Sequence, residues 1–406
     1  MDGPALPPDL RDALLRIKAE CDSELHRIAD WWLTHIQRAE GGYHGQIGLD
    51  GQPDPSVPVS GVLMTRILWF FSAAAETTGR EDLLTAANRA ADWLQTVFVD
   101  RNHGGIVWAS TPEGQIANGR KQAYGQAFGV YALARHARTT GAETSLRTAM
   151  SIFEHMEHHF RVPALGGYGE AYARDWSPID DIRLSEKDAF SPKTMNTHLH
   201  ILEAYAELLR ATGLDAVRGA LEHLLDVFLE RIVHPSGTHL QLFLSEDWQD
   251  ESAAVSFGHD IEAAWLLHDA AAALGNVSLQ VRINAACLAL SRAVLTSGTG
   301  SDGGVYNERH IADGRIDTSR IWWVQAEALV GFLDACVLSR DADFARAALN
   351  TWSLIKATII APEGEWRSNS MLDGTCDAWW AGPWKACYHN GRAMIEASRL
   401  VSLLTI

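Results

Sequence analysis

The sequence predicts an all-α protein, an (α/α)6 barrel of six helical hairpins with short extended turns, and three observations support this prediction. A glycine-containing turn beside an aromatic or extended run occurs six times, several long apolar stretches end in glycine, and the apolar residues between these markers recur at helical spacing. A chain of 406 residues exceeds the size at which one compact core usually stops growing. It therefore forms either two domains or one barrel-like domain.

The six turns are GGYHGQ at 41, GGIVWAS at 104, GGYGEAY at 166, PSGTHLQLF at 235, GGVYNE at 303 and PEGEWRS at 362. The intervals between Gly42, Gly105, Gly167, Gly237, Gly304 and Gly364 are 63, 62, 70, 67 and 60 residues. Each interval has room for two helices and their connections. Six such units nearly fill the chain.

A second set of glycines marks helix ends, in ETTG at Gly79, RTTG at Gly141, RATG at Gly213 and AALG at Gly275. Glycine after the last helical turn is the expected left-handed cap. Because one hairpin cannot bury its apolar face alone, we expect the six to close into an inner and an outer ring. An open solenoid is the alternative. Polar and aromatic residues on the inner-helix candidates favour closure, since a barrel lumen gives them a concave site.

Composition limits the class of protein and its partners. Hydrophobic residues make up 47% of the chain and charged residues 21%, as in ordinary globular proteins. A net charge of -17 disfavours nucleic acid as a partner. The N-terminus lacks a basic start followed by an apolar run, and no long apolar stretch follows, so we expect a cytoplasmic protein without a membrane anchor. We expect a monomer or a weak homo-oligomer.

The five cysteines, at positions 21, 287, 336, 376 and 387, are scattered and form no C-x-x-C pair. They are typical of reduced thiols in a core. Tryptophan is abundant, with 15 residues, and many of these lie beside glycine or histidine. Flat indole faces suit the C–H faces of sugars, although core packing explains many of them.

The segment KTMNTHLHILEAY, residues 193–205, is predicted to be a helix in which Asn196 and His200 share one face. His198 points elsewhere. A single histidine in a helix is more often a satisfied or exposed residue than a functional one. The pair on one face of an inner helix makes Asn196 and His200 candidates for a site.

The segment SFGHDIEAAWLL, residues 256–267, places Glu262 three residues after His259. At this spacing the carboxylate can accept a hydrogen bond from the imidazole, which fixes the tautomer and leaves a proton-accepting nitrogen. An ordinary surface ion pair is the alternative. The flanking apolar residues, Phe257, Ile261 and Trp265, argue against a solvated face.

Two segments near the C-terminus add aromatic residues and a second base. GPWKACYHNGRAMIE, residues 382–396, places Trp384 and His389 just before a final helix. IWWVQAEALVGF, residues 321–332, begins a helix at Trp322, with Glu327 following. Trp322 or Trp323 is expected to stack on a sugar ring while the other packs.

Arg66 interrupts the apolar helix SGVLMTRILWFF, and a guanidinium there needs an anionic or polar partner. It holds either a sugar oxygen or a buried acid. Tyr124, in KQAYGQAFGVY, takes the corresponding place in the next hairpin.

We expect no metal, because there is no H-E-x-x-H and no cysteine pair, and His259 and Glu262 alone cannot complete a site. Phosphate-loop and dinucleotide motifs are also absent from the sequence.

Together, RLSEKD with KTMNTHLH, SFGHDIEAAWLL, WWVQAEALVGF and WKACYHNGR resemble the cellobiose 2-epimerase group of the N-acylglucosamine 2-epimerase superfamily. The resemblance spans essentially the whole chain and independently implies an (α/α)6 barrel that needs no cofactor. It also implies a single catalytic domain over residues 1–406 and a small carbohydrate as substrate.

Residue by residue, the resemblance implies that His259 and His389 are the acid–base pair, that Glu262 supports the first, and that His200 assists near the sugar carbonyl. It further implies that substrate oxygens are held by Arg66, Tyr124 and Asn196, and that sugar rings stack on Trp322 and Trp384. Two positions depart from the usual pattern of the group, since Val324 and Cys387 stand where proline is common. The loop of residues 365–382 also departs from it, and we expect this loop to shape a second sugar site.

The chemistry that fits these residues is inversion at one carbon of a sugar. The C2 proton of a ring-opened aldose is acidified by the adjacent carbonyl, and a neutral imidazole near pH 7 can remove it. Reprotonation of the enediolate on the opposite face gives the epimer. We therefore predict an isomerase, a sugar 2-epimerase that interconverts glucose and mannose configuration at the reducing end of cellobiose-like β-1,4-linked disaccharides.

Three other functions stay open at this point. The first is a monosaccharide mannose 2-epimerase or a mannose isomerase. The second is an inverting glycoside hydrolase, whose paired carboxylates would come from Asp175, Asp180, Asp260 and Glu262. The third is a noncatalytic sugar-binding protein, which does not explain why imidazoles occur in three separate inner segments.

Overall fold

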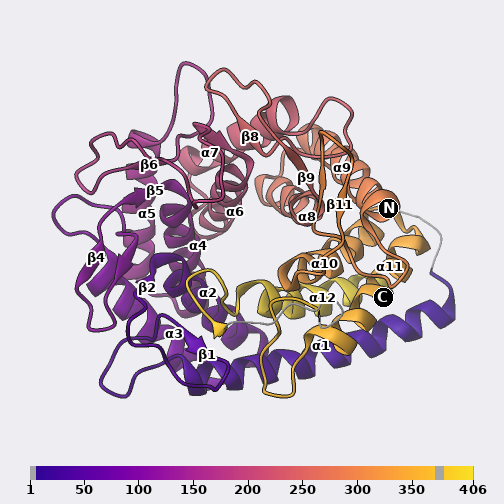
Figure 1. Ribbon diagram of the computed structural model, residues 1–406, viewed down its shortest axis with the longest axis horizontal. Coiled ribbons are helices and arrows are strands. Elements are labelled where there is room, and N and C mark those ends of the chain that lie inside the picture. Colours follow the sequence, from indigo (N-terminus) through magenta and orange to yellow (C-terminus); the bar gives the residue numbers. More distant parts are fainter. Residues whose placement is uncertain (1–5, 371–378, 406) are drawn as a thin grey trace.

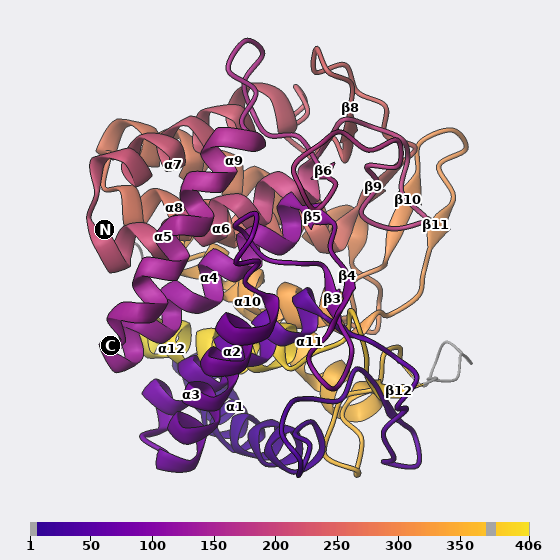
Figure 2. The ribbon, with the colours of Figure 1, turned by 90° about the vertical axis from the view of Figure 1, so that its left-hand side faces the viewer.

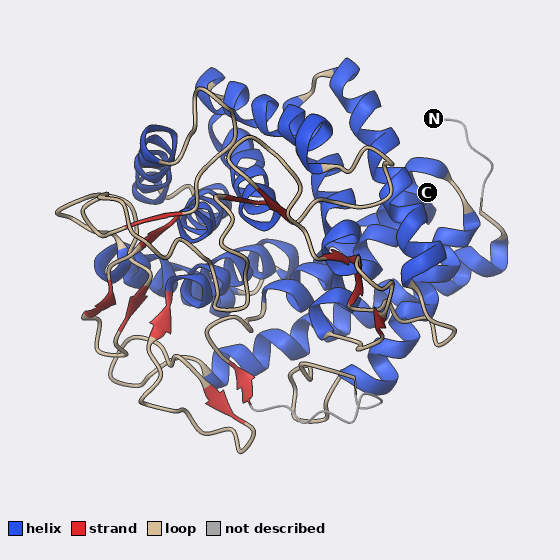
Figure 3. Cartoon of the chain, turned by 45° about the horizontal axis from the view of Figure 1, so that its top comes forward, coloured by secondary structure: helices blue, strands red, loops and turns tan. Residues whose placement is uncertain are grey.

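The computed structural model describes residues 6–370 and 379–405, and most of these residues are helical (Figure 3). The inner helices are α2 (Gly61–Thr78), α4 (Ala123–Thr140), α6 (Met195–Thr212), α8 (Phe257–Leu274), α10 (Trp322–Ser339) and α12 (Tyr388–Thr405). The outer helices are α1 (Pro8–His35), α3 (Glu81–Trp93), α5 (Glu143–His159), α7 (Asp215–Val227), α9 (Val277–Ala293) and α11 (Ala342–Leu354). Each inner helix contacts the next, and α12 contacts α2 (Figure 1). The predicted (α/α)6 barrel is confirmed.

The two ends of the described chain meet to complete the ring. The long first helix, α1, lies outside and packs against α12, the last inner helix (Figure 1). Each of the six glycine turns leads into an inner helix. The first five inner helices, α2, α4, α6, α8 and α10, are each followed in the chain by an outer helix. The sixth hairpin is therefore assembled from helices at opposite ends of the sequence.

Glycine has a defined conformational role at the predicted markers. The helices α2, α4, α6 and α8 end in left-handed glycines, at Gly79, Gly141, Gly213 and Gly275, as predicted. In α10 the same position is taken by Arg340, with φ of 57°, which is why the glycine pattern stops after four helices. At the turn glycine Gly167, a Cβ atom would lie 2.6 Å from the Trp248 ring. Only glycine fits there without a shift of the indole.

Short antiparallel strands form five small sheets in the described part of the chain. The strands are β1 (Ile47–Gly48), β2 (Val59–Ser60), β3 (Ala109–Ser110), β4 (Ile116–Asn118), β5 (Lys121–Gln122), β6 (Ala171–Tyr172), β7 (Lys193–Thr194), β8 (Phe243–Leu244), β9 (Ala254–Ser256), β10 (Glu308–His310), β11 (Ile316–Asp317) and β12 (Trp379–Ala381). They gather at one end of the barrel (Figure 2). Because β2, β5, β7 and β9 run directly into inner helices, the N-terminal ends of these helices open onto this rim.

Four inner helices are fixed to their glycine turns by a polar side chain at the fourth helical position. Backbone N–H groups donate to these side chains from Ile106 to Gln126 (2.7 Å), from Tyr168 to His198 (3.0 Å), from Leu240 to Asp260 (2.8 Å) and from Val305 to Gln325 (2.8 Å). Each bond is buried, so it satisfies a backbone donor that would otherwise be costly. His198 is thus a structural residue, and the sequence analysis expected only that it points elsewhere than His200.

Some features of the outer ring were not predicted. The helices α3, α7, α9 and α11 continue into five-residue π-helical turns, at Leu94–Phe98, Phe228–Ile232, Val294–Gly298 and Ile355–Ile359.

Four cysteines, at positions 21, 287, 336 and 387, are buried free thiols, as predicted, and Cys376 lies outside the described residues. Within the described part of the chain, every helix is too short or too polar to span a bilayer.

Candidate active site

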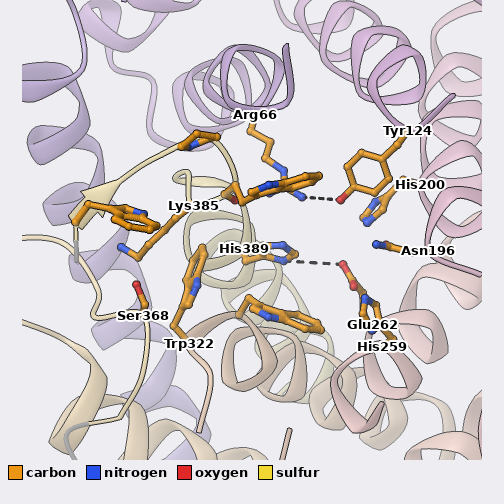
Figure 4. Close-up of a pocket in the computed structure, with 14 residues that line it drawn as sticks. Arg66, Tyr124, Asn196, His200, His259, Glu262, Trp322, Ser368, Lys385 and His389 are labelled. Atoms are coloured by element: carbon orange, nitrogen blue, oxygen red, sulfur yellow. Dashed lines mark hydrogen bonds and ion pairs between the residues drawn. The ribbon is translucent and has the colours of Figure 1, made fainter. Parts of the chain in front are cut away.

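A cavity of about 340 Å³ opens at the rim where the inner helices begin, and every inner helix contributes a side chain to it (Figure 4). All nine predicted site residues line this cavity: Arg66, Tyr124, Asn196, His200, His259, Glu262, Trp322, Trp384 and His389. The eight that lie on helices fall within the first six residues of their helix. Helical geometry at the open end of the barrel therefore brings together residues that are far apart in the sequence.

His389 is held by a carboxylate behind it. Its Nδ1 atom lies 2.6 Å from Oε1 of Glu327, which also accepts a hydrogen bond from Trp265 through its other oxygen. A carboxylate only accepts, so Nδ1 carries the proton and Nε2 is left with a free lone pair. Burial lowers the pKa of His389 to about 3, although the Glu327 carboxylate opposes this shift. The ring is therefore neutral at pH 7.

His259 is held differently from the sequence prediction. Its Nδ1 atom lies 2.8 Å from the hydroxyl of Ser256, the residue that caps α8. Glu262 accepts a hydrogen bond from Arg392 at 2.8 Å, so the predicted bond between Glu262 and His259 is wrong. The physical reason is that a buried carboxylate gains more from a guanidinium than from a neutral imidazole. Burial lowers the pKa of His259 to about 4, so this ring is also neutral.

The predicted histidine–glutamate spacing does form a hydrogen bond, but in another helix. In α6, Nδ1 of His200 lies 3.0 Å from Oε2 of Glu203, three residues further on. Burial lowers the pKa of His200 as well. The cavity is therefore lined by three imidazoles, of which two are backed by a carboxylate and one by a hydroxyl.

Arg66 bonds to neutral oxygens, so one of its two expected partners, a buried acid, is not found among the described residues. Its guanidinium donates to the Tyr124 hydroxyl at 2.9 Å and to the Trp384 carbonyl at 2.7 Å, and not to a buried acid (Figure 4). Arg66 is only 3% exposed. Within the described residues, its Nε and the Oδ1 of Asn196 are buried without a hydrogen-bond partner. Unpaired polar atoms at a cavity suit a polar ligand.

Tryptophans form the apolar part of the cavity wall. Trp322 and Trp323 both line it, rather than one lining it while the other packs elsewhere. The Trp323 ring contacts the His259 and His389 rings, at centroid distances of 4.8 Å and 5.6 Å. Trp384 is 42% exposed and stands beside Tyr124.

A second cavity of about 580 Å³ adjoins the first. The two share Asn196, Pro383 and Trp384, and the second is also lined by Trp108 and by residues 184–188. The sequence placed the second site in the loop of residues 365–382, of which residues 371–378 lie outside the described part. From the described parts of that loop, Ser368 and Trp379 line the first cavity.

Several residues around the cavity were missed by the sequence analysis. Lys385 lines the cavity, and Glu203 and Arg392 lie behind it. Glu203 follows His200 by three residues, which is the spacing used for His259 and Glu262, so the sequence contained a signal for Glu203. Arg392 bonds to carboxylates of other helices, for which local spacing gives no signal. Glu327 was noted only as a neighbour of Trp322.

Glu262, Glu327 and His389 offer ligand atoms within 4.8 Å of one another, which is a geometry that a metal ion can use. In this protein Arg392 donates to both carboxylates, at 2.8 Å and 2.7 Å. A metal would have to displace a buried guanidinium that already pairs with the same oxygens. The donor set therefore suits Arg392 better than a metal ion.

The four acids considered for an inverting hydrolase, all within the described residues, do not meet as a pair at this cavity. Of the four acids considered, Glu262 lines it. Asp260 accepts from the Leu240 backbone, and Asp175 accepts from Ser177 on an exposed loop. A hydrolase needs two carboxylates on opposite sides of one glycosidic bond, whereas Glu262 is the single carboxylate that residues 6–370 and 379–405 place on the wall of this cavity.

Comparisons with known proteins agree with this geometry. The model of the N-acylglucosamine 2-epimerase (GlcNAc 2-epimerase) family matches residues 41–393. A cellobiose 2-epimerase from Bacteroides fragilis is 38% identical over 94% of this chain and 98% of its own length. The solved structure of the cellobiose 2-epimerase from Bacillus thermoamylovorans superimposes with a TM-score of 0.90 at 32% identity, over 94% of this chain and 98% of that chain. A D-mannose isomerase from Thermobifida fusca is 27% identical over 77% of this chain and 76% of its length.

A helical barrel whose cavity is lined by three imidazoles, together with these relatives, defines a carbohydrate epimerase, which is an isomerase. Its reaction class is that of a sugar 2-epimerase. The chain belongs to the N-acylglucosamine 2-epimerase family.

Proposed function

We propose that this enzyme interconverts glucose and mannose configuration at C2 of the reducing-end residue of cellobiose-like β-1,4-linked disaccharides, without a cofactor. The observation that carries the proposal is that His259 from α8 and His389 from α12 line one cavity and contact the same indole, that of Trp323. Two bases beside one small cavity can address the two faces of one carbon. The names of the most similar relatives support the choice of substrate.

In the proposed mechanism, one imidazole removes the C2 proton of the ring-opened sugar and the other protonates C2 from the opposite face. The ring that acts as base is neutral, which burial of both histidines favours because it lowers their pKa values. The ring that acts as acid enters the cycle as an imidazolium, with a proton taken up from solvent. After one turnover the base holds the proton removed from C2, and the acid has given its own proton to the opposite face. His259 and His389 exchange these roles when the reaction runs in reverse.

Arg66 supplies the positive charge that an enediolate requires. Its partners are a phenol and a backbone carbonyl, so its charge is not cancelled by a directly bonded carboxylate. In a cavity with little water, such a preorganised donor stabilises a developing negative charge more than it does in bulk water. His200 assists at the sugar carbonyl, and Tyr124 and Asn196 hold substrate oxygens.

The adjoining second cavity supports a disaccharide as substrate. Trp384 and Asn196 line both cavities, so a reducing-end ring in the first leaves room for a second ring beside Trp108 and Trp384. Indole faces stack on the C–H faces of sugars. Trp322 is the stacking partner for the ring whose C2 reacts.

The second candidate is a monosaccharide 2-epimerase or a mannose isomerase, and the Thermobifida fusca relative favours it. Both reactions begin with removal of the C2 proton and pass through an enediolate. They differ in the carbon that receives the proton, because protonation at C2 gives the epimer and protonation at C1 gives the ketose.

The test is nuclear magnetic resonance of cellobiose, lactose, glucose and mannose, each incubated with the enzyme in deuterated water. The proposal predicts deuterium at C2 of the reducing-end residue of cellobiose, with the mannose-configured product. Turnover restricted to monosaccharides, or a ketose product, supports the second candidate. Two reducing sugars from one disaccharide indicate a hydrolase. Binding without any deuterium uptake indicates a sugar-binding protein.

A further inference from the structure

Behind the cavity, one buried arginine connects three carboxylates that come from three different helices. Arg392 is 1% exposed, and its guanidinium donates to Glu203 of α6, Glu262 of α8 and Glu327 of α10. Tyr388 of α12 donates to Glu203 at 2.6 Å and accepts from Arg392. We call Arg392 with Glu203, Glu262 and Glu327 the carboxylate cluster.

Two members of the cluster also hold the imidazoles of the cavity. Glu203 pairs with Nδ1 of His200 at 3.0 Å, and Glu327 pairs with Nδ1 of His389 at 2.6 Å. The chain of contacts therefore runs from His200 through Glu203, Arg392 and Glu327 to His389. These two histidines come from opposite parts of the sequence, yet one guanidinium links the groups that orient them.

We propose that Arg392 and Glu203 are positioning residues of this enzyme: they couple the orientation of His200 to that of His389, so that both rings keep their protons on Nδ1 and turn Nε2 toward the cavity. This inference rests on the proposed function for its catalytic consequence, and on the contacts above for its physical basis. Neither residue is among those that line the two cavities. Each acts through a histidine.

The formal charges of the cluster support this role. Three carboxylates face one guanidinium. Burial and the neighbouring Glu327 raise the pKa of Glu262 to about 8, whereas the pKa values of Glu203 and Glu327 lie at about 2, because Arg392 and the bonded histidines outweigh the effect of burial. Two ionised carboxylates therefore share one guanidinium near pH 7, and the cluster keeps an excess of negative charge. That excess favours a positive charge on an adjacent imidazole, which is the charge that a histidine acquires when it takes a proton from carbon. The other titratable or charged groups around the cluster include Arg66, Tyr124, Tyr131, Tyr388, His200, His259 and His389.

The chain offers a matched control for Glu203 on the same helix. Glu207 lies one turn further along α6, and both glutamates are 4% exposed. Glu207 pairs with Arg138, Arg135 and Arg210 and makes no described contact with the cavity. Loss of its charge tests what the removal of a buried glutamate from α6 does to the fold alone.

The first test compares Glu203→Gln with Glu207→Gln in the full-length enzyme. A glutamine at 203 keeps the size of the side chain, but it can donate to Nδ1 of His200 as well as accept from it, so the tautomer is no longer fixed. We expect kcat to fall by about 10- to 100-fold with KM within about twofold, the range for groups that orient a functional histidine. Glu207→Gln keeps the wild-type kcat. Equal kcat values for the folded forms of both variants would overturn the proposal.

The second test measures coupling directly. If Arg392 links the two histidines, Glu203→Gln and Glu327→Gln disturb one network, so the double variant loses less activity than the product of the two single losses. We expect the activity loss of the double variant to be at least about fivefold smaller than the product of the two single losses. This difference should disappear in an Arg392→Lys background, since lysine cannot bridge three carboxylates. Strictly multiplicative losses would contradict the coupling. If Arg392→Lys does not fold, the comparison of Glu203→Gln, Glu327→Gln and their double variant still tests the coupling.

A third measurement does not depend on turnover, so it separates this inference from the proposed function. Nitrogen-15 spectra of histidine-labelled protein report which ring nitrogen carries the proton. The signals of His200 and His389 are assigned by their loss in single variants of those residues. We expect Glu203→Gln to change the signals of both histidines, and Glu207→Gln to change neither. An unchanged His389 signal in Glu203→Gln overturns the inference, whereas absence of C2 exchange in the wild type overturns only the proposed function.

Discussion

The two sides of the cavity hold their histidines in different ways. On the α12 side, His389 is tied to Glu327, which Arg392 and Trp265 hold in turn. On the α8 side, His259 is tied to the hydroxyl of Ser256, which also caps the helix. A carboxylate accepts hydrogen bonds only, whereas a hydroxyl both donates and accepts. His389 is therefore fixed in one tautomer, while His259 is free to place its proton on either nitrogen.

This difference indicates how a reversible proton transfer can be divided between two similar side chains. His389 has a negative partner that stabilises its protonated form, because Glu327 opposes the effect of burial on its pKa. His259 has no carboxylate directly bonded to Nδ1 among the described residues, since Glu262 pairs with Arg392. Loss of the group behind His389 should therefore cost more than loss of the group behind His259.

The largest expected effect comes from removing either imidazole. His389→Ala and His259→Ala should each lower the rate of C2 deuterium exchange by about 10³-fold or more, within the range of general acid–base catalysis. Exchange is measured by nuclear magnetic resonance in deuterated water. His26→Ala is the control, because His26 is an exposed histidine of α1. Wild-type exchange in either cavity variant would show that the two sides do not form an acid–base pair.

The second largest effect is expected for Glu327, the carboxylate that pairs with His389. Glu327→Gln should lower kcat by about 10- to 100-fold, because the partner that fixes the His389 tautomer loses its charge. The measurement is kcat and KM on the sugar that shows exchange. Glu207→Gln again serves as a control for loss of a buried glutamate. A loss no larger than that of the control would mean that the carboxylate contributes only to folding.

The pH dependence of activity tests whether the ring that acts as base stays neutral in moderate acid. Burial lowers the pKa of His389 to about 3 and of His259 to about 4, below the ordinary histidine value of about 6.5. The acidic limb of kcat/KM, which reports protonation of the base, should therefore lie below pH 6.5. A limb at or above pH 6.5 would mean that the rings titrate as they do in water.

Much of the site followed from the sequence because the barrel is periodic. The glycine turns locate the start of each inner helix, and residues in the first turns of those helices face one opening. Arg66, His200 and His389 therefore converge although hundreds of residues separate the first from the last. The barrel needs only spacing and apolar pattern, and both are present in a single sequence.

What the sequence analysis missed depends on partners from other helices. It paired Glu262 with His259 because they are neighbours in one helix, but Arg392, which is 130 residues away, takes that carboxylate. Spacing within one helix does not show whether a carboxylate pairs with a neutral side chain of the same helix or with a charged side chain from another helix. Arg340 shows the same limit, since it takes the left-handed conformation that glycine marks in the other helices.

The same neutral imidazoles also predict how stability responds to acid. In the unfolded chain His200, His259 and His389 bind protons near pH 6.5, whereas burial lowers their pKa values in the folded state. The unfolded state thus binds more protons below pH 6.5, so stability is full above this pH and falls as the pH drops toward 4. Thermal unfolding should show a smaller drop over this range for His259→Gln than for the wild type. An equal drop would mean that His259 is not buried in its neutral form.

The smallest effect is expected on the hydroxyl side, where Ser256 both caps α8 and contacts His259. Ser256→Ala should destabilise the fold by about 1 kcal/mol, because α8 loses its N-cap. Its effect on kcat should stay below about tenfold, since water can replace a hydroxyl at Nδ1 and His259 needs no fixed tautomer. Asn276→Ala is the matched control, because Asn276 caps the outer helix α9 away from the cavity. The two variants should unfold at similarly lowered temperatures while only Ser256→Ala changes kcat. If Ser256→Ala lowers kcat as much as Glu327→Gln does, the two sides of the cavity are equivalent, and the asymmetry inferred from their partners has no catalytic meaning.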